Sequence, residues 1–148
     1  MARKYKQGFF TPENPKKYSG DVNNIVYRSG WERKIFRKLD IDQRCIEWSS
    51  EEVVIPYKSP IDNKIHRYFV DVKATFIYPD KSLKTFLVEI KPFKQTIEPK
   101  PKQGKKKQVF LNEVLTYSVN QAKWDAAIKY CQEKNWQFKI MTEKEIGM

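Results

Sequence analysis

The chain of 148 residues is long enough for one domain with a buried core and short for two. It has no apolar run near the ~18 residues of a membrane span, no secretory signal and only two cysteines, which cannot form a disulfide framework. Its 29 lysines and arginines exceed 18 aspartates and glutamates, for a net charge of +11. This charge favours nucleic acid as the partner, because phosphate contacts release counterions. A basic surface without a partner is the alternative.

Residues 1–24 are expected to form a basic arm. Lysines and arginines outnumber the aspartates and glutamates of this segment, and the prolines at positions 12 and 15 prevent a long helix. The arm is either disordered or laid across a single domain that comprises residues 25–148.

A capping box marks the start of the first helix. Ser29 and Glu32 have its spacing, with Ser29 as the N-cap and Glu32 at the third helical position. The helix is expected to end at Leu39 or Asp40, where the helical spacing of apolar residues stops. These apolar residues are Trp31, Ile35, Phe36 and Leu39.

Three extended segments follow. The β-branched run at 53–55 ends at Pro56, which suits the end of a strand or an edge strand. Residues 65–78 are expected to form one long strand, and residues 85–90 a buried strand. Turns between them are predicted at Asp62–Lys64 and at Pro79–Ser82. A three-stranded antiparallel meander is the simplest arrangement of these strands.

The remainder is predicted to be a mobile basic loop followed by helix and strand. Residues 94–107 are rich in lysine and proline. Apolar residues from 110 to 131 then recur at heptad-like intervals, which predicts one helix, or two with Asn120 as an N-cap. Alternation over 136–140 predicts a last strand, and the Thr142-x-x-Glu145 box caps a final short turn or helix.

Two carboxylates and a lysine are predicted to meet on the strongest pair of strands. Glu89 and Lys91 share one strand face, because side chains alternate along a strand. Asp71 lies in the preceding strand, and pairing through the turn at 79–82 brings it near Glu89. Glu32, beside the apolar stripe of the first helix, is positioned to add a third carboxylate.

Converging carboxylates repel each other unless a divalent cation joins them. Mg²⁺ prefers oxygen ligands, and when bound it polarises a phosphodiester and acidifies a water. Lys91 would orient or deprotonate that water, or stabilise the developing charge. Ordinary structural roles are the alternatives: an exposed ion pair for Glu89 and Lys91, the capping box for Glu32, and protection of a strand edge for Asp71. The order of these groups along a basic chain favours the chemical interpretation.

This order resembles the PD-(D/E)xK nuclease superfamily over about residues 27–146. The matching motifs are Arg28-Ser29-x-x-Glu32, Val54-Ile55-Pro56-Tyr57, His66-Arg67-Tyr68-x-x-Asp71 and Val88-Glu89-Ile90-Lys91-Pro92. Val70 stands where the family motif has proline. The block from Asn120-x-Ala122-Lys123-Trp124 to Glu145 is similar to the TnsA-like branch. The resemblance implies an α/β, restriction-endonuclease-like fold. We expect a mixed β-sheet of four to five strands flanked by helices, with the Glu32 helix and the long C-terminal helix on opposite sides.

The resemblance also implies roles for site residues. Glu32, Asp71, Glu89 and the main-chain carbonyl of Ile90 would bind Mg²⁺, for which Mn²⁺ would substitute, and Lys91 would be the catalytic lysine. We expect hydrolysis of DNA with low sequence specificity, by endonuclease action and by exonuclease action as a further option.

Candidate DNA contacts are basic residues around this site: Arg28, His66, Lys94, Lys105, Lys106, Lys107 and Lys123. Solubility is an equal explanation for Arg28 and the lysines, and a structural role in a strand is the alternative for His66. One histidine and no Cys-x-x-Cys do not favour zinc, so Cys45 and Cys131 are expected to be buried.

The whole sequence is also similar to the small basic head completion nucleases of T-even-like tailed phages. That likeness implies that the DNA end of a filled head is processed before the tail joins. Double-stranded DNA would be the substrate, phage portal or head–neck proteins the partners, and host cytoplasm or virion the location, with no membrane. The alternatives are a non-catalytic DNA-end or portal-binding protein and a junction-resolving endonuclease.

Overall fold

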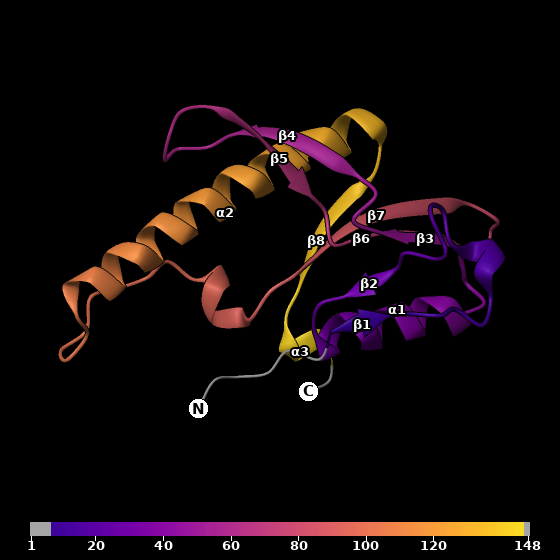
Figure 1. Cartoon of the computed structure of the whole chain (residues 1–148). Coiled ribbons are helices and arrows are strands. Elements are labelled where there is room, and N and C mark those ends of the chain that lie inside the picture. Colours follow the sequence, from indigo (N-terminus) through magenta and orange to yellow (C-terminus); the bar gives the residue numbers. More distant parts are fainter. Residues whose placement is uncertain (1–6, 147–148) are drawn as a thin grey trace.

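A mixed four-stranded sheet forms the centre of the computed structural model, which describes residues 7–146 (Figure 1). Its strand order is β3-β6-β7-β8, and β8 runs parallel to β7 whereas the other neighbours are antiparallel. The strands are β3 (Cys45–Ser50), β6 (Val72–Ile77), β7 (Leu83–Ile90) and β8 (Gln137–Met141). This sheet confirms the expected mixed architecture. None of the helices in the described range is long and apolar enough to cross a membrane.

Helix α1 (Gly30–Ile41) packs on one face of the sheet. It begins after Ser29, whose hydroxyl oxygen accepts a hydrogen bond from the Glu32 N–H at 3.2 Å, as the capping box predicts. Its buried stripe meets Trp48 of β3, and the Phe36 and Trp48 ring centroids are 5.2 Å apart. The short helix α3 (Glu143–Ile146) adds the buried Ile146 to this core, and the predicted box at Thr142 forms.

Helix α2 (Lys107–Lys134) packs against the second hydrophobic cluster, which includes Leu87 of β7. It is one continuous helix, so the alternative of two helices with Asn120 as an N-cap is wrong. Asn120 is buried in the middle of α2, and the helix contains no proline or glycine that would interrupt it. In Figure 1 the N-terminal part of α2 extends away from the sheet.

The predicted long strand over 65–78 is wrong, because it divides into β5 (Ile65–Phe69) and β6, which belong to different sheets. Strand β5 pairs instead with β4 (Val54–Lys58), and the pair forms a separate hairpin. The three-stranded meander and a strand end at Pro56 are therefore also wrong, whereas the alternative of an edge strand at Pro56 is confirmed. Pro56 lies inside β4, and a proline is tolerated there because β4 has a neighbour on one side only.

The described part of the N-terminal arm is laid across the domain. Strand β1 (Gly8–Phe9) pairs with β2 (Val26–Tyr27), and the short helix η1 (Pro15–Lys17) follows. The Phe10 ring lies 5.8 Å from the rings of both Phe36 and Trp48, in edge-on geometry. Residues 1–6 of the predicted arm, and residues 147–148 of the predicted domain, lie outside the described range.

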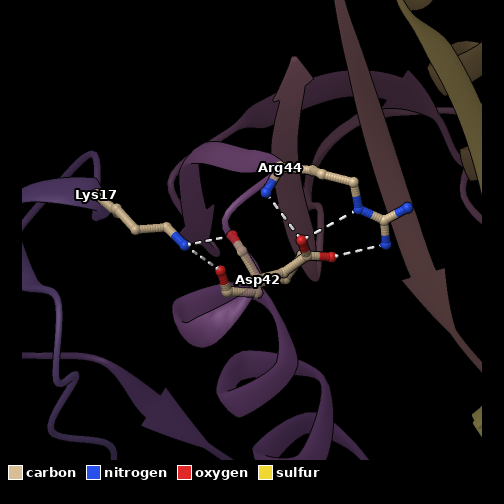
Figure 2. Close-up of polar contacts among 4 residues, drawn as sticks. Lys17, Asp42 and Arg44 are labelled. Atoms are coloured by element: carbon tan, nitrogen blue, oxygen red, sulfur yellow. Dashed lines mark hydrogen bonds and ion pairs between the residues drawn. The ribbon is translucent and has the colours of Figure 1, made fainter. Parts of the chain in front are cut away.

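Lys17 fastens the arm to the C-terminal end of α1 (Figure 2). Its Nζ donates hydrogen bonds to the carbonyl oxygens of Leu39, Asp40 and Asp42 at 2.7, 2.8 and 2.8 Å. The last carbonyls of a helix have no partner within the helix, and they carry the negative end of its dipole. The partly buried ammonium group of Lys17 therefore satisfies them and offsets their charge at the same time.

Replacing Lys17 with methionine is expected to lower the free energy of unfolding by about 1.5–3 kcal/mol, because three carbonyls lose a charged donor. Urea unfolding measures this change. Lys16→Met is the matched control, since Lys16 is the exposed neighbour in the same short helix. Equal stabilities of the two variants would contradict the assigned role of Lys17.

Candidate active site

The change of sheet between β5 and β6 places Asp71 opposite Glu89. Val72 pairs with Val88, so the residues on either side of that pair face each other at the end of the two strands. The Asp71 Oδ2 accepts a hydrogen bond of 2.8 Å from the backbone N–H of Ile90. The predicted convergence of two carboxylates is thus present, although Asp71 lies between two strands and not in the middle of one.

Each carboxylate oxygen of Glu89 has a side-chain partner, the Tyr68 hydroxyl group for one and the Lys91 ammonium group for the other. Glu89 is 4% exposed, and its Oε1 accepts a hydrogen bond of 2.7 Å from the Tyr68 hydroxyl group. Its Oε2 lies 3.8 Å from the Nζ of Lys91, which confirms that residues 89 and 91 share a strand face. Because Glu89 is buried, an ion pair on a solvated face does not describe this arrangement.

Burial and like charge raise the pKa values of Asp71 and Glu32. The pKa of Asp71 lies well above its usual range, first because the group is buried and then because Glu89 is near, with a smaller effect from Glu32. Burial also raises the pKa of Glu32. The pKa of Tyr68 is raised by burial and by the negative charge of Glu89, so its hydroxyl group remains a hydrogen-bond donor. The protein therefore assembles repelling carboxylates that a cation would stabilise.

Glu32 both caps α1 and faces this cluster. Its Oε1 accepts a hydrogen bond from the backbone N–H of Arg28 at 3.1 Å. In a standard capping box the donor would be the backbone N–H of the N-cap residue, Ser29, so the observed donor lies one residue earlier. This bond holds the carboxylate at the start of the helix, from where its charge acts on Asp71. The capping role and the site role are therefore compatible.

Two residues of the site were not predicted, Glu51 and Tyr68. Glu51 follows β3 with a left-handed φ of 56°, and its carboxylate binds Arg28 through Nε–Oε2 and Nη2–Oε1 distances of 2.9 and 3.1 Å. Its charge contributes to the raised pKa of Glu32. The two consecutive acids Glu51 and Glu52 were the only signal in the sequence, and strand β3 before them was not predicted. Tyr68 belongs to the motif His66-Arg67-Tyr68-x-x-Asp71. Its contact with Glu89 could not be predicted, because it depends on the change of direction between β5 and β6.

The donor set suits a hard cation, but three ligands are not assembled. Within residues 7–146 no group of three histidine, cysteine, aspartate or glutamate side chains is close enough to hold a metal ion. The facing pair Asp71 and Glu89 offers oxygen donors, which suit Mg²⁺ or Mn²⁺ better than zinc. A divalent cation would offset the burial and the like charge that raise the pKa of Asp71. The pair fits such an ion, whereas Glu32 stands outside it.

A groove of about 1190 Å³ opens at this site. Its lining includes Glu32, Ile90 and Lys91, together with two of the predicted DNA contacts, Arg28 and Lys94. Asp71 and Glu89 are not in the lining, so the groove borders the site through Glu32, Ile90 and Lys91.

The other predicted DNA contacts lie outside the groove lining. His66 binds Asp62 at 2.7 Å on the β4–β5 hairpin. Lys123 lies over the rings of Tyr57 and Tyr68, with its Nζ 5.9 and 5.6 Å from their centroids.

The start of α2 carries the remaining three predicted contacts. Lys105 forms an ion pair with Glu113 at 2.7 Å, whereas Lys106 and Lys107 are exposed. The two predicted buried cysteines, Cys45 and Cys131, are buried and free.

A mixed sheet with facing acids and a lysine at the end of its central strands defines a restriction-endonuclease-like nuclease domain. A family model described as TnsA-like endonuclease N terminal matches residues 42–143, and the chain belongs to that family. The chain is also 40% identical over 139 residues to the head completion nuclease of Enterobacteria phage T4. That match covers 92% of this chain and 90% of the relative.

Removing the Tyr68 hydroxyl group is expected to destabilise the protein. Tyr68→Phe leaves a buried carboxylate oxygen of Glu89 without its donor, which should lower the free energy of unfolding by about 1–3 kcal/mol. Tyr57→Phe is the control, because Tyr57 is buried in the same cluster and its hydroxyl group has no hydrogen bond to the described residues. Urea unfolding compares the two, and a larger loss for Tyr57→Phe would contradict the assignment.

The raised pKa of Asp71 makes the metal-free protein less stable as the pH rises. A carboxyl group with a folded-state pKa above its unfolded value, about 3.9, stabilises the fold below that value. This stabilisation is lost as the pH rises through the folded-state pKa. Asp71→Asn keeps an acceptor for the Ile90 N–H but carries no charge.

In EDTA, Asp71→Asn should therefore be more stable than the parent protein near neutral pH and should show a weaker pH dependence. Thermal unfolding between about pH 4.5 and 8 measures this difference. Asp125→Asn, at an exposed position on α2, is the control. An unchanged pH dependence in Asp71→Asn would refute the electrostatic account.

Proposed function

We propose that this protein is a Mg²⁺-dependent deoxyribonuclease of low sequence specificity that processes packaged DNA ends in phage head completion. The observation that carries this proposal is the pairing of Asp71 with the buried Glu89, with Lys91 beside them, in a chain of an endonuclease family. The name of the phage T4 relative supports the role in head completion. Mn²⁺ would substitute for Mg²⁺, and exonuclease action is an additional proposed activity.

The residues divide the chemical work between holding a cation and handling the phosphate. Asp71, Glu89 and the carbonyl group of Ile90 would hold the ion. Glu32, which stands outside this pair, is the proposed further ligand and would have to move toward the ion. When bound, the ion supplies a polarised phosphodiester and a water of lowered pKa. Lys91 is placed to orient that water or to neutralise charge on the phosphate oxygens. Tyr68 keeps Glu89 in position.

The surface favours DNA contacts through phosphates. Arg28 and Lys94 line the groove at the site, and Lys106 and Lys107 are exposed at the start of α2. Phosphate contacts of this kind carry no sequence information, which accords with low specificity. Arg28 and Lys105 contribute less to this role, because their charges are already paired with Glu51 and Glu113. His66 and Lys123 remain proposed contacts at the β4–β5 hairpin and on α2.

In the virus the substrate would be the end of packaged double-stranded DNA, before head and tail join. Portal or head–neck proteins would be the partners, and the host cytoplasm or the virion the location. These points rest on similarity to the phage T4 protein, which spans nearly the whole chain.

Purified protein is expected to nick supercoiled plasmid in Mg²⁺ and to stop in EDTA. Asp71→Ala and Lys91→Ala should each lose roughly 10²-fold or more of the rate while keeping DNA binding. The exposed α2 residues Glu133 and Lys129 supply matched control variants, Glu133→Ala and Lys129→Ala.

Absence of cleavage by the wild-type protein in both Mg²⁺ and Mn²⁺ would overturn the enzymatic proposal and leave a non-catalytic DNA-end-binding protein. Comparing four-way junctions with linear duplexes of the same sequence tests for a junction-resolving endonuclease. A marked preference for the junction would replace the proposed substrate.

A further inference from the structure

The groove at the active site continues beyond the catalytic residues along α1. One wall is the N-terminal arm, with Phe9 of β1 and Tyr27 of β2 in the lining. The other wall is the segment after β7, which includes Lys94. Arg33 and Arg37 of α1 lie between these walls in the lining. The arm therefore helps to shape the approach to the active site.

The α1 side of this groove is positively charged. Arg33 and Arg37 are exposed and lie one helical turn apart, so their side chains are on the same face. The guanidinium group of Arg33 lies 5.7 Å from the centroid of the Tyr27 ring, which positions it without neutralising it. Arg37 has no ion pair with the described residues, so its charge is available to a ligand.

The acids in the groove lining oppose these cations only weakly. Asp40 is 2% exposed, and its carboxylate accepts hydrogen bonds from the backbone N–H groups of Glu13 and Asn14 at 2.7 and 3.1 Å. Glu32 belongs to the catalytic cluster. Glu13 is the remaining acid among the described lining residues. The groove therefore suits an anionic ligand.

Phe9 places an exposed aromatic ring at this basic groove. It is 69% exposed although it belongs to a paired strand, opposite Val26. The strand lies close to its neighbour, because a Cβ at Gly8 would meet the Tyr27 hydroxyl oxygen at 2.6 Å. The backbone thus holds an apolar ring toward solvent, where it can stack on a planar ligand.

We propose that the groove binds a short unpaired segment of DNA next to the cleavage site. Phe9 stacks on a base, and Arg33 and Arg37 contact the phosphates. A single strand fits better than a duplex, because bases inside a duplex are stacked on both faces and only the terminal pairs have a face free for an aromatic side chain. The volume of about 1190 Å³ lies just above the ~300–1,000 Å³ of small-molecule sites, which suits a few nucleotides. The inference rests on the proposed nuclease function and specifies the form of DNA at its site.

Binding of labelled single-stranded and blunt duplex oligonucleotides of equal length tests this site. Fluorescence anisotropy is measured in EDTA, so that no cleavage occurs. Phe9→Ala is expected to weaken single-strand binding roughly tenfold and to leave duplex binding nearly unchanged. Phe9→Trp should retain the binding, which separates loss of stacking from loosening of the arm. Phe69→Ala is the control, since Phe69 is an exposed aromatic residue on β5 outside the groove lining.

The arginines are tested by salt dependence. Replacing Arg33 and Arg37 with alanine should reduce the slope of log K against log salt for single strands by about 1.4, or about 0.7 for each lost phosphate contact. Arg44→Ala is the control, because Arg44 is exposed and lies outside the groove lining.

Unchanged single-strand binding in Phe9→Ala, or an equal loss for single strands and duplexes, would overturn the proposal. An unchanged salt slope in the double arginine variant would do the same. These outcomes are independent of catalysis. A wild-type protein that binds single strands through the groove but never nicks plasmid would contradict the nuclease function alone. A protein that nicks plasmid but whose single-strand binding is unchanged in Phe9→Ala would contradict the proposed DNA site in the groove and leave the nuclease function intact.

Discussion

The hydrogen bond from the Ile90 N–H to the Asp71 carboxylate is the contact on which the site depends. It joins the end of β7 to the residue where the chain leaves the β4–β5 hairpin and enters the central sheet. That position sets Asp71 against Glu89, and burial then makes their repulsion strong. Packing in the rest of the fold must offset the free energy of this repulsion, because two like charges do not stabilise their own arrangement.

Those surroundings are two hydrophobic clusters that meet on β7. Val88 and Ile90 belong to the cluster under α1, whereas Leu87 belongs to the cluster with α2. Side chains that alternate along one strand therefore connect both halves of the core. The site draws on both of them, because Glu32 comes from α1 and Tyr68 from the α2 cluster.

Much of the site could be predicted from the sequence because it rests on local rules. Strand alternation placed Glu89 beside Lys91, and a short hairpin placed Asp71 opposite Glu89. The division of residues 65–78 could not be predicted, because both halves have the same aromatic and β-branched composition and neither glycine nor proline marks the junction. Strand β3 was missed, since its buried Ser49 and Ser50 break the apolar pattern. Glu51, with its left-handed φ, comes directly after β3, so its place in the site could not be predicted once the strand was missed.

The position of β8 has a consequence for how the protein becomes active during synthesis. This strand is formed by residues near the C-terminus, yet it pairs in parallel with β7, and the Lys91 N–H donates to the Met141 carbonyl oxygen at 3.0 Å. The residues that flank Lys91 therefore gain their last partner only after about fifty further residues, including all of α2, have been made. A ribosome-bound chain that ends before β8 lacks this support. Assembly of the site around Lys91 is therefore delayed until β8 has been synthesised.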